Sequence, residues 1–157
     1  MNAILSILTA ALAVLGSHAE RSLGCRAEFG EQVTVPGLTA AASLNHHQYV
    51  VVRFAAATTV NIASEVLVSG ALKGPLGVLQ NKPYVNEPAQ VCVMGLSKVF
   101  AGGTITAGAP ISYDSSGHVV DAVSGDVVIG RGLEAATTAG EKVSAIIFPP
   151  VKWGSVA

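Results

Sequence analysis

Charged side chains are scarce in this sequence of 157 residues, and their scarcity limits what the protein can bind. Asp, Glu, Lys and Arg make up 12% of the chain, against about 25% in an ordinary soluble protein. The formal net charge is −1, so the chain lacks the basic surface that binds DNA, RNA or an anionic membrane. Half of the residues are hydrophobic. We therefore expect part of the apolar surface to be buried against other chains.

Cysteine is also scarce, since the chain contains only Cys25 and Cys92. Two cysteines do not make a disulfide scaffold of the small secreted kind, although one disulfide is formally open to them. Cys92 lies within an apolar strand pattern, where a free thiol behaves as a small hydrophobic side chain. We expect both thiols to be reduced.

The apolar run at the N-terminus is too short to cross a bilayer. It extends over thirteen residues, Ala3 to Leu15, whereas a transmembrane helix needs about 20. Asn2 as N-cap and Gly16 after the C-terminus favour a helix over residues 1–16. A helix of this length needs a neighbour, which is another copy, a groove on a partner or the chain's own β-domain. The predicted contact residues of its apolar stripe are Ile4, Leu8, Leu12 and Leu15.

A secretory signal is the alternative interpretation of the same run. Ser17-His18-Ala19 resembles a signal-peptide cleavage site, but no Lys or Arg precedes the apolar residues. We therefore favour a retained helix, followed by an arm or linker over residues 17–47 in which no periodicity is sustained.

A mainly β domain is predicted over residues 48–150, with a C-terminal tail over residues 151–157. Short apolar strands recur between glycine-bearing turns, at the spacing of a small β-barrel or sandwich. Val91–Met94 is apolar on both faces and should be central, and Pro149-Pro150 should end the last strand. The tail carries the only tryptophan, Trp153, which we also predict to be an interface residue. The expected strands are 49–54, 60–62, 66–69, 77–80, 91–94, 110–113, 118–122, 127–134 and 142–148.

The sequence contains no catalytic, metal or nucleotide motif. His46 and His47 are adjacent and would point to opposite faces of a strand, and neither His18 nor His118 stands at ligand spacing. No serine lies in Gly-x-Ser-x-Gly, and Gly130-Arg131-Gly132 lacks the third glycine of a dinucleotide fingerprint. Asp114 and Asp126 fall at turns, where aspartate bonds its own backbone. We expect a non-enzymatic protein without cofactor or metal.

The succession of strands and turns in the second half resembles the capsid cement, or head decoration, proteins of tailed bacteriophages. The resemblance covers about residues 48–148. Its segments are Gly77–Pro83, Ala89–Gly95, Ser97–Gly103, Ile105–Gly108, Asp114–Gly117, Ile129–Ala136 and Ala139–Val143. Each segment alone is weak, because it is only a strand with a glycine turn. The long front end, residues 1–44, departs from the family pattern.

The resemblance implies a small β-barrel-like domain, often trimeric, on the outer surface of an icosahedral phage head. There it would clamp neighbouring major capsid subunits, with no role for nucleic acid or membrane. The alternative is an exported β-sandwich binding module whose signal peptide is cleaved. Two further alternatives are a small hydrolase using Asp114, His118 and Glu134, and another virion part such as a head fibre base or tail component.

Overall fold

The computed structural model describes residues 32–55, 59–62 and 74–154 as strands, turns and loops. Within these ranges there is no helix, hence none with the length and hydrophobicity to span a membrane. The predicted helix over residues 1–16 and the predicted strand 66–69 lie outside the described residues. The described strands are β1 Val33–Val35, β2 Thr39–Ala40, β3 Val51–Phe54, β4 Thr59–Ile62, β5 Pro75–Leu79, β6 Val91–Phe100, β7 Pro110–Tyr113, β8 Val119–Asp121, β9 Val127–Gly132 and β10 Lys142–Lys152.

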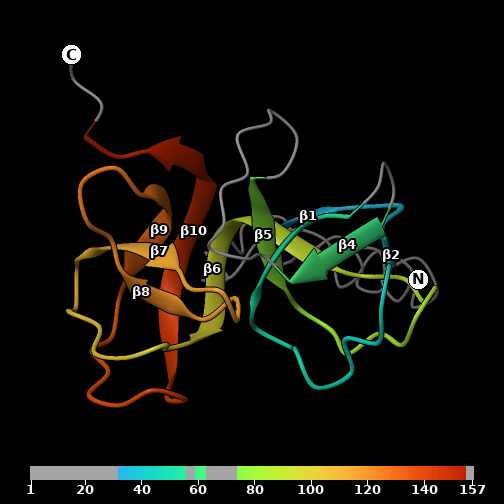
Figure 1. Ribbon diagram of the computed structural model, residues 1–157, viewed down its shortest axis with the longest axis horizontal. Coiled ribbons are helices and arrows are strands. Elements are labelled where there is room, and N and C mark those ends of the chain that lie inside the picture. The colour runs from blue at the N-terminus through green and yellow to red at the C-terminus, as the bar shows by residue number, and fades with distance from the viewer. Residues whose placement is uncertain (1–31, 56–58, 63–73, 155–157) are drawn as a thin grey trace, which may run out of the picture.

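The strands form one highly curved sheet in the order β2-β4-β3-β5-β6-β10-β9-β7-β8, with β1 paired to β6. β1 to β4 lie on one side of the molecule and β7 to β10 on the other, with β5 and β6 between them (Figure 1). A bridge between Ala101 and Val119 connects the end of β6 to β8. The sheet is therefore a nearly closed barrel, which confirms the predicted mainly β class.

Two hydrophobic cores lie on either side of β3, β5 and β6. Val51, Val78 and Cys92 belong to the core of the C-terminal strands, whereas their neighbours in sequence belong to the core of the N-terminal strands. Successive side chains of a strand point to opposite faces. These three strands are apolar at consecutive positions because both of their faces are covered. This confirms the central position predicted for residues 91–94, except that Met94 is 47% exposed.

The N-terminal boundary of the domain lies earlier than residue 48. β1 and β2 fall within the segment expected to be an arm, and both are paired in the sheet. Leu38, Ala40 and Leu44 are buried in the core of the N-terminal strands. The small-residue run around them shows no period because its strands are too short to show one.

The sequence analysis expected the last strand to end at Pro149-Pro150, and this prediction is wrong. β10 continues to Lys152, and pairing with β9 resumes at Val151 after a register shift that contains both prolines. Beyond Ile147 this strand pairs with β9 only. A residue without an N–H is tolerated where the ladder is already interrupted.

Two aspartates close tight turns, as predicted. The Asp114 carboxylate accepts hydrogen bonds from the N–H groups of Ser116 (2.8 Å) and His118 (3.0 Å) in the β7–β8 hairpin. The Asp126 carboxylate accepts one from the N–H of Val123 (2.9 Å). Both carboxylates therefore serve as backbone acceptors in turns.

Glu141 gives one source of pH-dependent stability. Its carboxylate accepts hydrogen bonds from the Thr137 hydroxyl (3.0 Å) and the Thr138 N–H (2.9 Å). Hydrogen bonds from the Thr138 and Thr137 side chains hold the pKa of Glu141 below its ordinary value. A lowered pKa stabilises the folded protein above the ordinary glutamate pKa of about 4.3, and this stabilisation is lost as the pH falls through the folded pKa.

The Glu141→Gln variant should therefore lose less stability on acidification than the unmodified protein. Urea unfolding at a series of pH values between about 6 and 2 measures the difference. The two curves should converge at the acid end, where the wild-type carboxylate is protonated. Parallel curves over the whole range would contradict the assignment.

Candidate functional site

The predicted interface residues are only partly within the described structure. Ile4, Leu8, Leu12 and Leu15 lie outside it. Trp153 is 38% exposed, and its main chain is fixed to the β8–β9 turn. Its N–H donates to the Asp126 carbonyl (2.8 Å), and its carbonyl accepts from the N–H of Gly125 (3.0 Å). The same turn carries Val123, whose carbonyl accepts from the N–H of Asp126 (3.1 Å), and Val151 precedes Trp153 by two residues. Both valines are exposed, and we call the three residues the Trp153 patch.

Three strands of the C-terminal half present a more extended surface, which we call the β6–β10–β9 face. Leu96 on β6 is the register partner of Ile146 on β10, and Ile146 is that of Arg131 on β9. In the next row Lys98 is paired with Ser144. Leu133, just after β9, donates its N–H to the Ser144 carbonyl (2.9 Å). Cross-strand partners point to the same side of a sheet, so these six side chains share one face.

Apolar side chains on this face remain in contact with solvent. Ile146 is 45% exposed and Leu133 is 51% exposed. Val33 and Met94 are register partners where β6 bends, and they add two more exposed apolar side chains beside it. A surface carried by paired strands is more rigid than one carried by loops. The face can therefore dock a preformed partner with little ordering of its own.

The polar groups of the face are held by one another. The Lys98 ammonium donates to the Ser144 hydroxyl (2.7 Å) and lies 3.8 Å from a carboxylate oxygen of Glu134. The other contact of Glu134 is the N–H of Ser144, which donates to it at 2.7 Å. That hydrogen bond is the main reason why the pKa of Glu134 is below its ordinary value. Glu134 therefore has a structural role on this face.

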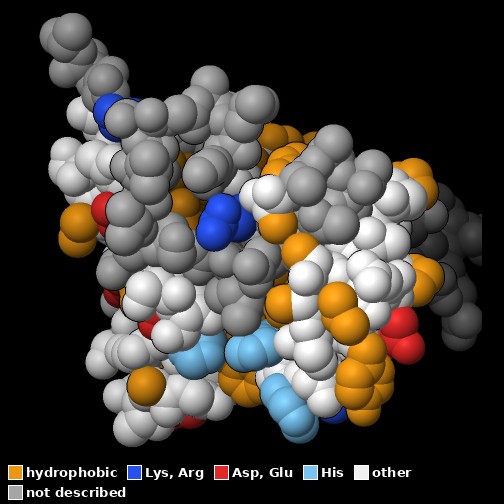
Figure 2. Space-filling model, turned by 45° about the vertical axis from the view of Figure 1, so that its right-hand side comes forward, with side chains coloured by type: hydrophobic (Ala, Val, Ile, Leu, Met, Phe, Trp, Pro, Cys, Tyr) orange, Lys and Arg blue, Asp and Glu red, His pale blue; other side chains and the backbone are white. Residues whose placement is uncertain are grey.

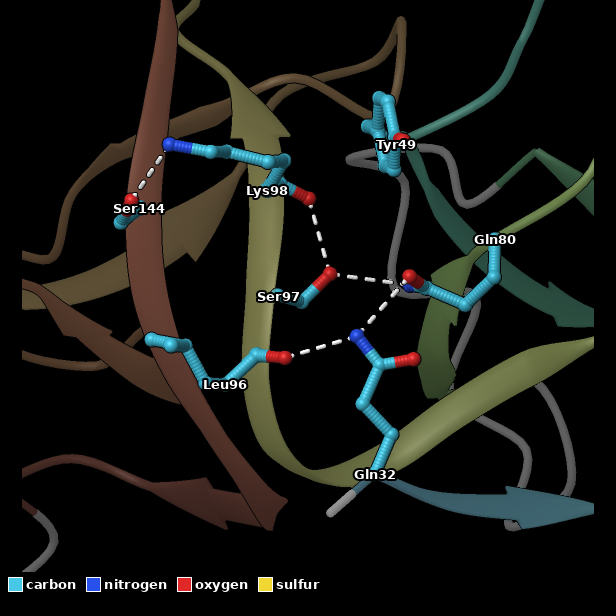
Figure 3. Close-up of a pocket in the computed structure, with 7 residues that line it drawn as sticks. All are labelled: Gln32, Tyr49, Gln80, Leu96, Ser97, Lys98 and Ser144. Atoms are coloured by element: carbon cyan, nitrogen blue, oxygen red, sulfur yellow. Dashed lines mark hydrogen bonds between the residues drawn. The ribbon is translucent and has the colours of Figure 1, made fainter. Parts of the chain in front are cut away.

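A small polar cavity adjoins the face beside the second half of β6 (Figure 3). Its volume is about 260 Å³, and it is lined by Gln32, Tyr49, Gln80, Leu96, Ser97, Lys98 and Ser144. Gln80 donates from its amide to the Ser97 hydroxyl (2.9 Å), and Gln32 donates to the Leu96 carbonyl (2.7 Å). Pockets for drug-sized ligands measure about 300–1,000 Å³. The cavity is therefore small for a whole cofactor.

Three histidines, His46, His47 and His118, lie closer together than the sequence indicates. Figure 2 shows histidine side chains gathered in one region of the surface. Burial, and then the proximity of His46 and His118, lower the pKa of His47. Within the described part of the chain, no three or more His, Cys, Asp or Glu side chains are grouped so that they could hold a metal ion.

Cys92 is buried and unpaired in the core. Burial raises the pKa of its thiol. A buried thiol with a raised pKa carries little thiolate and is unreactive. Cys25 lies outside the described residues.

The β6–β10–β9 face of the barrel combines exposed apolar side chains, Ile146 and Leu133, with charged and polar groups, which is the mixed character of a surface that can bind another protein. The comparisons with known proteins identify the family. The family model for the phage cement protein matches residues 30–147. The chain therefore belongs to the phage cement protein family and is a structural protein of the phage capsid, located on the virion. This confirms the resemblance drawn from the sequence.

A solved structure gives the same fold. It is the N base of the head fiber gp8.5 of bacteriophage phi29, which is 19% identical to this chain with a TM-score of 0.56. The similarity covers 74% of this chain and 93% of that one. At such low identity the likeness concerns the fold alone. No curated protein matches the sequence.

The sequence analysis missed the residues of the face and of the cavity. Leu96, Ser97 and Lys98 lie in the second half of β6, beyond the strand predicted over residues 91–94. Leu96-Ser97-Lys98-Val99 does not alternate between apolar and polar residues, so no period of two marks this part of the strand. The β-branched and aromatic pair Val99-Phe100 was a local strand signal beyond residue 94, but it could not have identified the strands beside it.

Proposed function

We propose that this protein stabilises the phage head by clamping neighbouring major capsid subunits through the β6–β10–β9 face. It acts as a structural protein without catalytic turnover, and its copies associate as homotrimers. The observation that carries the proposal is the coincidence of family membership with a rigid, exposed apolar face. The low charge of the chain supports an interface that depends mainly on apolar contact.

Such a protein stabilises by mass action. A ligand that binds only the assembled shell stabilises it by about 2.7 kcal/mol per site when its free concentration is 100 times Kd. The same contribution is repeated at every occupied site, and a copy that contacts two subunits resists their separation. Rigidity matters because each residue ordered on binding lowers the affinity.

Capsids that lack this protein should lose their integrity at a lower temperature than complete capsids, and adding the purified protein should restore the difference. Light scattering during heating, with negative-stain micrographs at each stage, measures the loss. Sedimentation of the free protein should give the mass of three chains of 15.9 kDa. If the protein binds capsids but their disruption temperature does not change, it has another role on the virion.

A further inference from the structure

Among the residues that the structure describes, the second half of β6 has a strand partner on one side only. From Gly95 to Phe100 it pairs with β10. Within the described ranges, its pairing with β1 and β5 ends at Met94 and Cys92 respectively. Leu96 and Lys98 on this length also line the polar cavity. The cavity therefore lies along an edge of β6 with which no described strand pairs.

The main-chain groups of Leu96 and Lys98 point to this free edge. The Ser144 carbonyl accepts from the N–H of Leu133, so it points away from β6. Ser144 and its register partner Lys98 consequently form a pair without mutual hydrogen bonds, and the peptide groups of Lys98 point away from β10. Leu96 and Phe100 lie two residues to either side of Lys98, so their peptide groups point to the same edge of the strand. Accordingly, the N–H of Phe100 donates to the carbonyl of Tyr49 (3.2 Å), across the edge from β10.

Side chains occupy the position that a further strand would take. The amide of Gln32 donates to the Leu96 carbonyl (2.7 Å), and the Ser97 hydroxyl donates to the Lys98 carbonyl (2.9 Å) (Figure 3). The side-chain amide of glutamine has the donor and acceptor of a peptide group. A neighbouring strand would donate a peptide N–H to the Leu96 carbonyl. The Gln32 amide makes that hydrogen bond in its place.

We propose that the free edge of β6 receives an extended segment of the major capsid protein as an additional strand, which displaces the Gln32 side chain. Strand addition to an exposed edge gives affinity through main-chain hydrogen bonds. The inference rests on the proposed function and names the contact that the capsid makes.

The position of the cavity favours a capsid segment over another occupant. Leu96, Lys98 and Ser144 belong to both the cavity and the β6–β10–β9 face, so a strand added here would lie beside the proposed docking face. The cavity lining is mostly amides and hydroxyls, and its one cation, Lys98, is paired with Glu134. Such a lining suits an uncharged peptide backbone better than a charged ligand.

Hydrogen exchange tests the inference directly. The protein is bound to capsids purified without it, exchanged in the bound state, and compared with the free protein by mass spectrometry. We expect the amides of Leu96 and Lys98 to exchange at least about tenfold more slowly when bound. Unchanged exchange on bound protein would overturn the inference. Two other outcomes would also overturn the inference. Slow exchange in the free protein that disappears when residues 1–31 are deleted would assign the edge to that segment of the same chain. Slow exchange that depends on protein concentration would assign the edge to a second copy.

Two variants give an independent readout. Gln32→Ala removes the competing amide and should slow release from capsids by about two- to tenfold, the range for one net hydrogen bond. Lys98→Pro removes an N–H that β10 does not use, and it should bind about tenfold more weakly than Lys98→Ala. Equal binding of Lys98→Pro and Lys98→Ala, or unchanged release of Gln32→Ala, would overturn the inference. Wild-type protein that fails to bind capsids would instead refute the proposed function.

Discussion

Replacing Gly130 with alanine should destabilise the protein by about 3 kcal/mol, near the upper end for an overpacked position. A Cβ atom at this position would overlap the carbonyl oxygen of Ile146. That oxygen belongs to the backbone of β10, which is paired on both sides, with β6 and with β9. Gly130 is itself paired with Ile111 on β7. Neither strand can move without breaking a ladder, so the overlap cannot be relieved locally. Urea unfolding followed by circular dichroism measures the loss.

Gly103→Ala is the matched control. A Cβ atom at Gly103 would meet no heavy atom within 4 Å, so the same substitution should change stability by no more than about 0.5 kcal/mol. Because Gly→Ala restricts the unfolded chain and so favours folding, a comparable loss in both variants would mean that the overlap with Ile146 is not its cause. A stable Gly130→Ala protein would contradict the close approach of β9 and β10.

The sequence was sufficient to predict the strands that have strong local signals. Pro110–Tyr113 was predicted with its observed bounds, and β9 lies within the predicted strand 127–134. These predictions depend on β-branched residues and turn glycines, which act locally. β1 and β2 were missed because strands of three and two residues are too short to establish an alternation.

The candidate face could not be predicted for a different reason. Leu96, Leu133 and Ile146 are neighbours only because β10 lies between β6 and β9 in a particular register. A shift by one residue would move all of their side chains to the other face. Strand order and register depend on the packing of the whole barrel, which no local pattern encodes. Trp153 was identified from composition alone, and the structure places it in the separate patch with Val123 and Val151.

Ile146→Asp should weaken capsid binding by about 30-fold or more while leaving the barrel folded. Ile146 is the middle residue of the row between Leu96 and Arg131 and is 45% exposed, so the free protein can hydrate an aspartate there. In the docked state the carboxylate would lose its hydration, and its neighbour Arg131 already donates to the Gly108 carbonyl (2.9 Å). The loss of an apolar contact at the centre of an interface typically costs 2 kcal/mol or more, which corresponds to the about 30-fold change. Cosedimentation with capsids measures the affinity.

Val123→Asp is the control for Ile146→Asp, because it introduces the same negative charge at a different place on the surface. Val123 is 66% exposed and lies in the Trp153 patch, outside the proposed face. The same aspartate there gives the protein the same net charge, so a long-range electrostatic effect would act on both variants alike. We expect Val123→Asp to bind capsids as the wild type does. A surface contributes to affinity only where the capsid covers it. If Val123→Asp lost binding and Ile146→Asp retained it, the capsid would therefore cover the Trp153 patch and not the β6–β10–β9 face.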